Sequence, residues 1–91
     1  MDTTIVFAFR DQLIPAVAFF SFEETPFLIF VLIKDPDLIL EFGEELTIHT
    51  DCEKVQFRNS DSTELRALKQ TIFQAVRHTE PFLKAKEKAN C

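Results

Sequence analysis

The residue types best suited to chemistry gather at one place in the chain, which holds His49, Asp51, Cys52 and Glu53. Imidazole, carboxylate and thiolate groups ligate metals and transfer protons in many protein sites. On an extended chain His49 and Asp51 point to one face and Cys52 to the other. A metal site needs three or four converging ligands, and no third ligand is evident beside His49 and Asp51. The pair is therefore a candidate polar site, with a strand end running into a turn as the simpler interpretation.

Motifs for other kinds of site are missing from the sequence. Gly43 is the only glycine, which excludes the glycine-rich phosphate loops and the nucleophile elbow G-x-S-x-G. The acidic residues between positions 35 and 45 lack the spacing of a calcium-binding EF-hand loop and are typical of solvated turns. We therefore expect no cofactor and no metal, and the sequence favours a protein that is not an enzyme.

Composition and charge narrow the classes of partner. The chain has eleven Phe and no Trp or Tyr, which indicates aromatic side chains used in a core rather than as stacking platforms. The formal net charge of -5 argues against nucleic acid as a partner. Residues 58–91 carry seven basic and four acidic side chains, whereas residues 1–57 carry three and eleven. A basic helix could meet an acidic protein partner, but complementation of the helix dipole explains the same pattern.

Hydrophobic periodicity predicts a series of short strands in the first two thirds of the chain. Runs of β-forming residues bounded by Asp, Glu, Asn and Pro predict strands at about 4–9, 15–22, 27–33, 38–42, 46–49 and 53–58. The breaks are short, which favours an antiparallel meander.

The period changes from two to about 3.6 after residue 60, which predicts a helix over about 62–79. One stripe along this helix is expected to be mostly apolar: Leu65, Leu68, Ile72, Ala75, Val76 and Thr79. Asp61 is placed to cap it, with Glu64 in the capping-box position. Pro81 then either bends this helix, which continues to about residue 88, or breaks it, with Thr79 capping a second short helix.

The resulting fold class is α+β: an antiparallel meander of five to six strands followed by one long C-terminal helix packed on one sheet face. Residues 1–91 are expected to form a single domain. The order of the elements resembles that of the pleckstrin-homology-like fold, and no sequence motif contributes to this resemblance. The resemblance implies a curled sheet capped by a C-terminal helix.

The middle strands are apolar on both faces, most plainly in the run Phe27–Ile33. A half-exposed antiparallel strand alternates apolar and polar residues, so both faces of this sheet need a cover, and one helix supplies only one. The second face could close into a barrel, pair with a second copy, or line a pocket for an apolar ligand. The candidate dimer or ligand face consists of Phe19, Phe20, Phe27, Phe30 and Leu32.

The cellular setting follows from charges and cysteines. The apolar stretch 15–33 has nearly the length of a membrane span, but Glu23, Glu24 and Pro26 interrupt it, so we expect no membrane segment. Two cysteines are too few for a disulfide framework and favour free thiols and the cytoplasm.

The sequence therefore favours a small non-catalytic interaction or assembly protein that acts as a homodimer. Two alternatives remain: a binding module for a small apolar ligand between sheet and helix, and an enzyme or metal site around His49 and Asp51.

Overall fold

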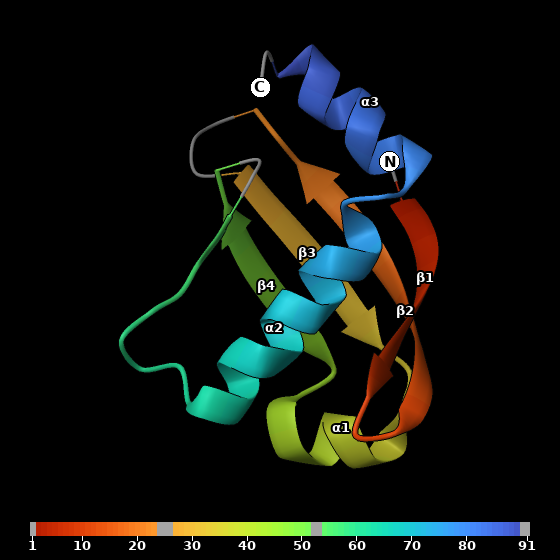
Figure 1. Ribbon diagram of the computed structural model, residues 1–91, viewed down its shortest axis with the longest axis vertical. Coiled ribbons are helices and arrows are strands. Elements are labelled where there is room, and N and C mark those ends of the chain that lie inside the picture. The colour runs from red at the N-terminus through yellow and green to blue at the C-terminus, as the bar shows by residue number, and fades with distance from the viewer. Residues whose placement is uncertain (1, 24–26, 52–53, 90–91) are drawn as a thin grey trace.

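The structure of the protein is a computed structural model that describes residues 2–23, 27–51 and 54–89. It has five strands and three helices in these residues (Figure 1). In chain order they are β1 (Asp2–Phe9), β2 (Gln12–Ser21), β3 (Phe27–Ile33), α1 (Pro36–Phe42), β4 (Glu45–Thr50), β5 (Val55–Gln56), α2 (Thr63–Val76) and α3 (Glu80–Lys88).

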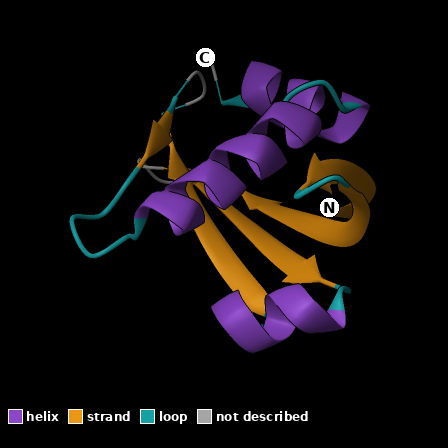
Figure 2. Cartoon of the chain, turned by 60° about the horizontal axis from the view of Figure 1, so that its bottom comes forward, coloured by secondary structure: helices purple, strands orange, loops and turns teal. Residues whose placement is uncertain are grey.

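The five strands form one antiparallel sheet in the order β1-β2-β3-β4-β5, so the predicted α+β class and the antiparallel meander are confirmed. The sheet is curled, and α2 packs inside the curl, where it contacts both edge strands, β1 and β5 (Figure 2). The strands do not close into a barrel, because β1 and β5 stand at opposite ends of the sheet order.

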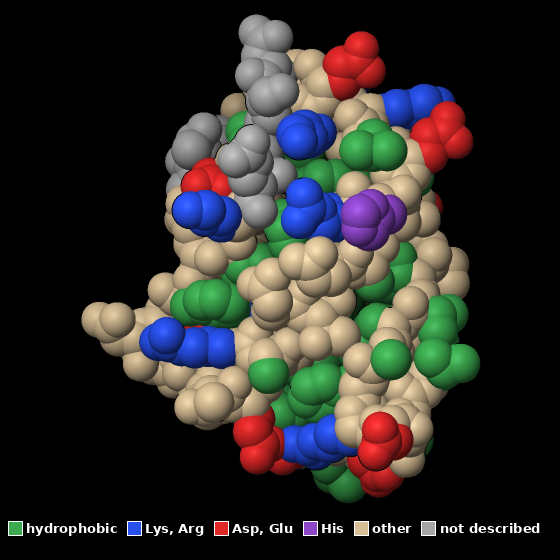
Figure 3. Space-filling model, in the orientation of Figure 1, with side chains coloured by type: hydrophobic (Ala, Val, Ile, Leu, Met, Phe, Trp, Pro, Cys, Tyr) green, Lys and Arg blue, Asp and Glu red, His purple; other side chains and the backbone are tan. Residues whose placement is uncertain are grey.

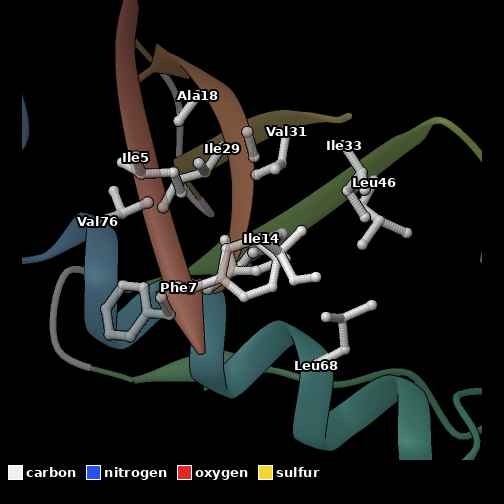
Figure 4. Packing of buried hydrophobic residues seen from close by; sticks show 14 of the residues in the cluster. Ile5, Phe7, Ile14, Ala18, Ile29, Val31, Ile33, Leu46, Leu68 and Val76 are labelled. Carbon is white, nitrogen blue, oxygen red and sulfur yellow. The ribbon is translucent and has the colours of Figure 1, made fainter. Parts of the chain in front are cut away.

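The core lies between the concave face of the sheet and the helices (Figure 4). Alternate strand residues point into it, because the side chains of a strand alternate between faces. The strands contribute Ile5, Phe7, Ile14, Ala16, Ala18, Ile29, Val31, Ile33, Leu46, Ile48 and Val55. The helices contribute Leu38, Leu68, Ile72, Phe73, Val76 and Phe82. The predicted stripe of α2 therefore does face the sheet.

The strand predicted at 38–42 is wrong: these residues belong to the helix α1. Asp35 is its N-cap and accepts a hydrogen bond from the Leu38 amide, and Pro36 occupies the first turn, where its missing N–H costs nothing. Gly43 ends the helix with a φ of 94°, a conformation that favours glycine. The short apolar run had no clear periodicity, and the capping residues decided its structure.

The single long C-terminal helix is also wrong, because α2 and α3 are separate. The alternative that placed a break before Pro81 describes the structure. Thr79 is the N-cap of α3 and accepts from the Phe82 amide, while its hydroxyl donates to the Val76 carbonyl. Proline is favoured in the first turn of a helix and unfavourable in its interior, so Pro81 starts a new helix.

Three smaller expectations also need correction. The N-cap of α2 is Ser62, which accepts from the Leu65 amide, and not Asp61. Of the sixth predicted strand, 53–58, the described residues 54–58 contain only the two-residue strand β5. Pro15 lies inside β2 and not at its start. The Pro15 carbonyl accepts a hydrogen bond from the Lys34 amide, just past the end of β3. The N–H that proline lacks would therefore lie at the end of the hydrogen-bond ladder between β2 and β3.

Phe82 should hold α3 to the rest of the protein. Its side chain is 1% exposed, and its ring lies 5.6 to 6.0 Å from those of Phe20, Phe22 and Phe73. We expect Phe82→Ala to lower the free energy of unfolding by about 3 kcal/mol or more, since it leaves a cavity among aromatic rings. The neighbouring Leu83 is 51% exposed, and Leu83→Ala should cost less than about 1 kcal/mol. Urea unfolding measures both, and equal effects would contradict this anchoring role.

Candidate functional site

The convex face of the sheet, opposite the helices, carries the main candidate site, and we call it the open face. Its members are the described strand residues that alternate with the core residues: Asp2, Thr4, Val6, Ala8, Leu13, Pro15, Val17, Phe19, Ser21, Leu28, Phe30, Leu32, Glu45, Thr47, His49 and Gln56. In the described part of the chain, α2 and α3 lie on the concave side and α1 at one end of the sheet (Figure 2). The open face is therefore without a helical cover in these residues.

The most exposed part of the open face is on the β1–β2 hairpin. Val6 pairs with Pro15 and Ala8 with Leu13, and all four side chains are exposed. Val6 is 56% and Leu13 76% exposed. These four residues, the hairpin patch, contain no polar side chain. Phe19, 36% exposed, continues the apolar surface along β2.

The residues predicted for the candidate face divide between the two faces. Phe19, Phe30 and Leu32 lie on the open face, where Phe30 is the cross-strand partner of Phe19. Phe20 and Phe27 point to the helix-covered side: Phe20 contacts Phe82, and Phe27 is 9% exposed. Phe27 is thus a buried residue, whereas Phe20 is half-buried and packs against the edge of the core.

The hairpin patch was not among the residues singled out from the sequence. Placing the start of the second strand at Pro15 left Leu13 outside any strand and hid its pairing with Ala8. The signal was nevertheless there, because Val6 and Ala8 are apolar in the alternate phase to Ile5 and Phe7. Apolar residues in both phases indicate a strand that needs cover on both faces.

His49 and Asp51, the two residues of the predicted polar site, have different surroundings in the structure. His49 lies on the open face of β4, opposite Leu28 and Gln56. Asp51 follows β4, and its carboxylate accepts a hydrogen bond of 2.9 Å from the Lys54 amide. The Asp51 amide donates in turn to the Lys54 carbonyl. Asp51 thus shapes the turn between β4 and β5, while Cys52, Glu53 and Cys91 lie outside the described residues.

The surroundings of His49 favour its neutral form. Partial burial lowers the pKa of His49 below its ordinary value, and the positive charges of Arg58 and Lys69 lower it further against the opposing effect of Asp61. A neutral imidazole can accept a proton or bind a metal. Among the described residues, however, no group of three or more His, Cys, Asp or Glu side chains could hold a metal ion.

A groove of about 830 Å³ lies between the end of β2 and the second half of α3. Phe20 and Phe22 line one side of it, and Ala85 and Ala89 line the other. Ser21 and four charged residues complete the lining, and the charged residues balance one another: Lys84, Lys88, Glu23 and Glu87. The volume is within the range of small-molecule sites.

A cluster of charged side chains joins the turn of the β1–β2 hairpin to two helices. Arg10 donates two hydrogen bonds to Glu41 of α1, of 2.5 and 3.1 Å, and a third to Glu64 in the first turn of α2. Its guanidinium also lies 5.2 Å from the centre of the Phe9 ring and 5.8 Å from that of Phe42. We call Arg10, Glu41 and Glu64 the Arg10 clamp. Hydrogen bonding raises the pKa of Arg10 and lowers that of Glu41.

A second ion pair, between Lys69 and Asp61, is buried. The N–O distance is 3.0 Å, and the side chains are 8% and 6% exposed. The same carboxylate accepts from the Arg58 amide at 3.2 Å, which connects α2 to the loop before it. Burial alone would raise the pKa of Asp61, but the hydrogen bonds from Lys69 and the Arg58 amide outweigh it and lower the pKa.

Basic side chains do not gather into one patch on the helix-covered side. Figure 3 shows Lys and Arg at several separate places over the helices and the loop before α2. Among the described residues, no helix is long and apolar enough to cross a lipid bilayer.

Comparison of the chain with known protein families, curated proteins and solved structures finds no match. The arguments about function therefore depend on the geometry of the chain itself.

The Asp61–Lys69 pair predicts a pH dependence of stability. Because the folded-state pKa of Asp61 is lowered, the pair stabilises the protein above the unfolded-state value of about 3.9. This contribution is lost as the pH falls through the folded-state pKa. Asp61→Asn should therefore lower the free energy of unfolding at pH 7 by roughly 2 kcal/mol and weaken its fall in acid.

Glu44→Gln, which removes the same charge at an exposed position, is the control. Urea unfolding between pH 7 and pH 2 measures both variants. If Asp61→Asn left the loss of stability at low pH unchanged, this would contradict a stabilising role for the Asp61–Lys69 pair.

Proposed function

We propose that the protein is a small non-catalytic assembly module that acts as a homodimer, in which a second copy covers the open face. The observation that carries the proposal is the hairpin patch, four exposed apolar side chains in adjacent positions on two paired strands. Contiguous apolar surface of this kind on a small domain marks an interaction site. An isologous dimer covers such a face with the same face of another copy.

The size of the open face is close to the lower limit for a dimer. Four strands of about seven residues cover roughly 23 by 19 Å, from about 3.3 Å per residue and about 4.8 Å between strands. That is about 440 Å² per copy, so two copies in contact over this face would cover roughly 900 Å² in total, near the value of about 1,000 Å² at which specific interfaces begin.

The charges of the open face are compatible with self-association. Among its members, Asp2 and Glu45 are the acidic residues, and they lie on β1 and β4 at opposite sides of the apolar surface. Stacking the apolar centres need not bring these carboxylates together. Thr47 and His49 of β4 are polar neighbours of this apolar surface. They can form the hydrated polar rim that surrounds a typical interface core.

The cytoplasm remains our proposed location, from the low cysteine content. A protein partner other than a second copy is an alternative occupant of the open face.

A ligand-binding role is the second candidate function, and the groove between β2 and α3 favours it. Phe20 and Phe22 offer apolar surface to a small molecule there. Native mass spectrometry of the purified protein tests this role. A bound lipid-like molecule lost on Phe22→Ser would support it, and no bound or bindable molecule would contradict it.

An enzyme or metal site around His49 and Asp51 stays a third alternative. Asp51 already accepts a hydrogen bond within its turn, which favours a structural role for it. A His49→Ala variant with unchanged activity and metal binding in a broad screen would exclude this alternative.

The dimer predicts a concentration-dependent mass in light scattering after size-exclusion chromatography. We expect wild-type protein to elute as a dimer and Leu13→Ser to weaken the dimer by about tenfold or more, since it removes the large apolar side chain that the hairpin patch exposes most. Leu40→Ser is the matched control, because Leu40 is 88% exposed on α1 and is not a member of the open face. A wild-type monomer at all concentrations, or equal effects of the two variants, would contradict the proposal.

A further inference from the structure

The end of the β1–β2 hairpin projects past the core. Phe7 and Ile14, 3% and 2% exposed, form its last fully buried pair. Two further pairs follow, Ala8 with Leu13 and Phe9 with Gln12, before the turn. Of these four residues only Phe9 packs against the core, and it is half-buried. The position of Leu13 therefore depends on contacts made beyond the core.

The turn itself has an unfavourable backbone for its sequence. Arg10 and Asp11 have φ values of 52° and 61°, the left-handed region that two-residue hairpin turns usually fill with Asn and Gly. Other residues in this region cost on the order of 1 kcal/mol each. A different pair of residues would close the hairpin at lower cost. What Arg10 adds is its side chain, which reaches α1 and α2 at once.

We propose that the Arg10 clamp positions the dimer surface by fixing the end of the hairpin against α1 and α2, so that Leu13 and the rest of the hairpin patch keep one orientation. This inference rests on the homodimer proposed above. Arg10 does not belong to the interface in this account. It acts through the hairpin, as a positioning residue.

The geometry of the clamp suits this role. A guanidinium that makes two parallel hydrogen bonds to one carboxylate fixes direction as well as distance. Glu64 approaches from a second element, and the Phe9 and Phe42 rings lie close to the same guanidinium. Asp11 follows Arg10 in the turn and is the acidic residue nearest to it in the sequence. The clamp's side chains are 42% to 64% exposed, so its strength is modest and screened by salt.

The decisive variant replaces Arg10-Asp11 with Asn-Gly. This change removes both the strained turn and the clamp, so the free energy of unfolding should stay the same or rise. The dimer dissociation constant, measured by sedimentation equilibrium, should nevertheless increase about 3- to 5-fold. A weaker dimer without a loss of stability is a result that a purely structural role for Arg10 does not give.

Two further variants complete the test. Glu41→Gln should weaken the dimer similarly, whereas Glu44→Gln, with the same change in charge, should not. Arg10→Lys keeps the charge but loses the planar pair of N–H donors of the guanidinium. Its dimer dissociation constant should therefore lie between those of the wild type and Arg10→Gln.

The failures of the two proposals are distinguishable. A wild-type dimer that the Asn-Gly variant forms equally tightly, or a loss of stability that accounts for the weaker dimer, would overturn this inference alone. A wild-type monomer at every concentration would overturn the proposed function as well.

Discussion

The structure depends on one constraint: the strands are apolar on both faces, and the helices cover only one of them. The concave face is filled by α2 and by the aromatic cluster around Phe82. The convex face keeps Val6, Leu13 and Phe19 exposed. Apolar burial is the main favourable term in folding and association, so this face is where an additional partner would contribute most. The proposed homodimer follows from that imbalance, and no catalytic group is required for it.

The curl of the sheet explains why a single layer of helices suffices for the concave side. Strands β1 and β5 both contact α2, so the helix fills the curl and lies beside both edges at once. The break at Thr79 then turns the chain, and α3 places Phe82 among Phe20, Phe22 and Phe73. The same curl makes the outer face convex, and its most prominent part is the hairpin that Arg10 connects to α1 and α2.

Periodicity in the sequence was sufficient to predict the meander, the α+β class and the stripe of α2, because these depend on patterns repeated over many residues. It failed at 38–42, where a run too short to show a period was decided by Asp35, Pro36 and Gly43. Strand alternation alone places Phe19 and Phe20 on opposite faces of the sheet. Which of the two faces the helices depends on how the sheet packs, and the structure assigns that side to Phe20, whose ring contacts Phe82. The Arg10 clamp joins residues 31 and 54 positions apart, and no local pattern could reveal it.

Methyl-detected NMR with a soluble paramagnetic probe tests the central claim, that a second copy covers the open face, most directly. The methyl groups of Val6 and Leu13 report on the hairpin patch, and those of Leu40, 88% exposed on α1, provide the reference. The account predicts that Val6 and Leu13 are shielded from the probe at high protein concentration and become accessible on dilution, while Leu40 stays accessible throughout. Val6 and Leu13 methyl groups as accessible as those of Leu40 at every concentration would contradict it.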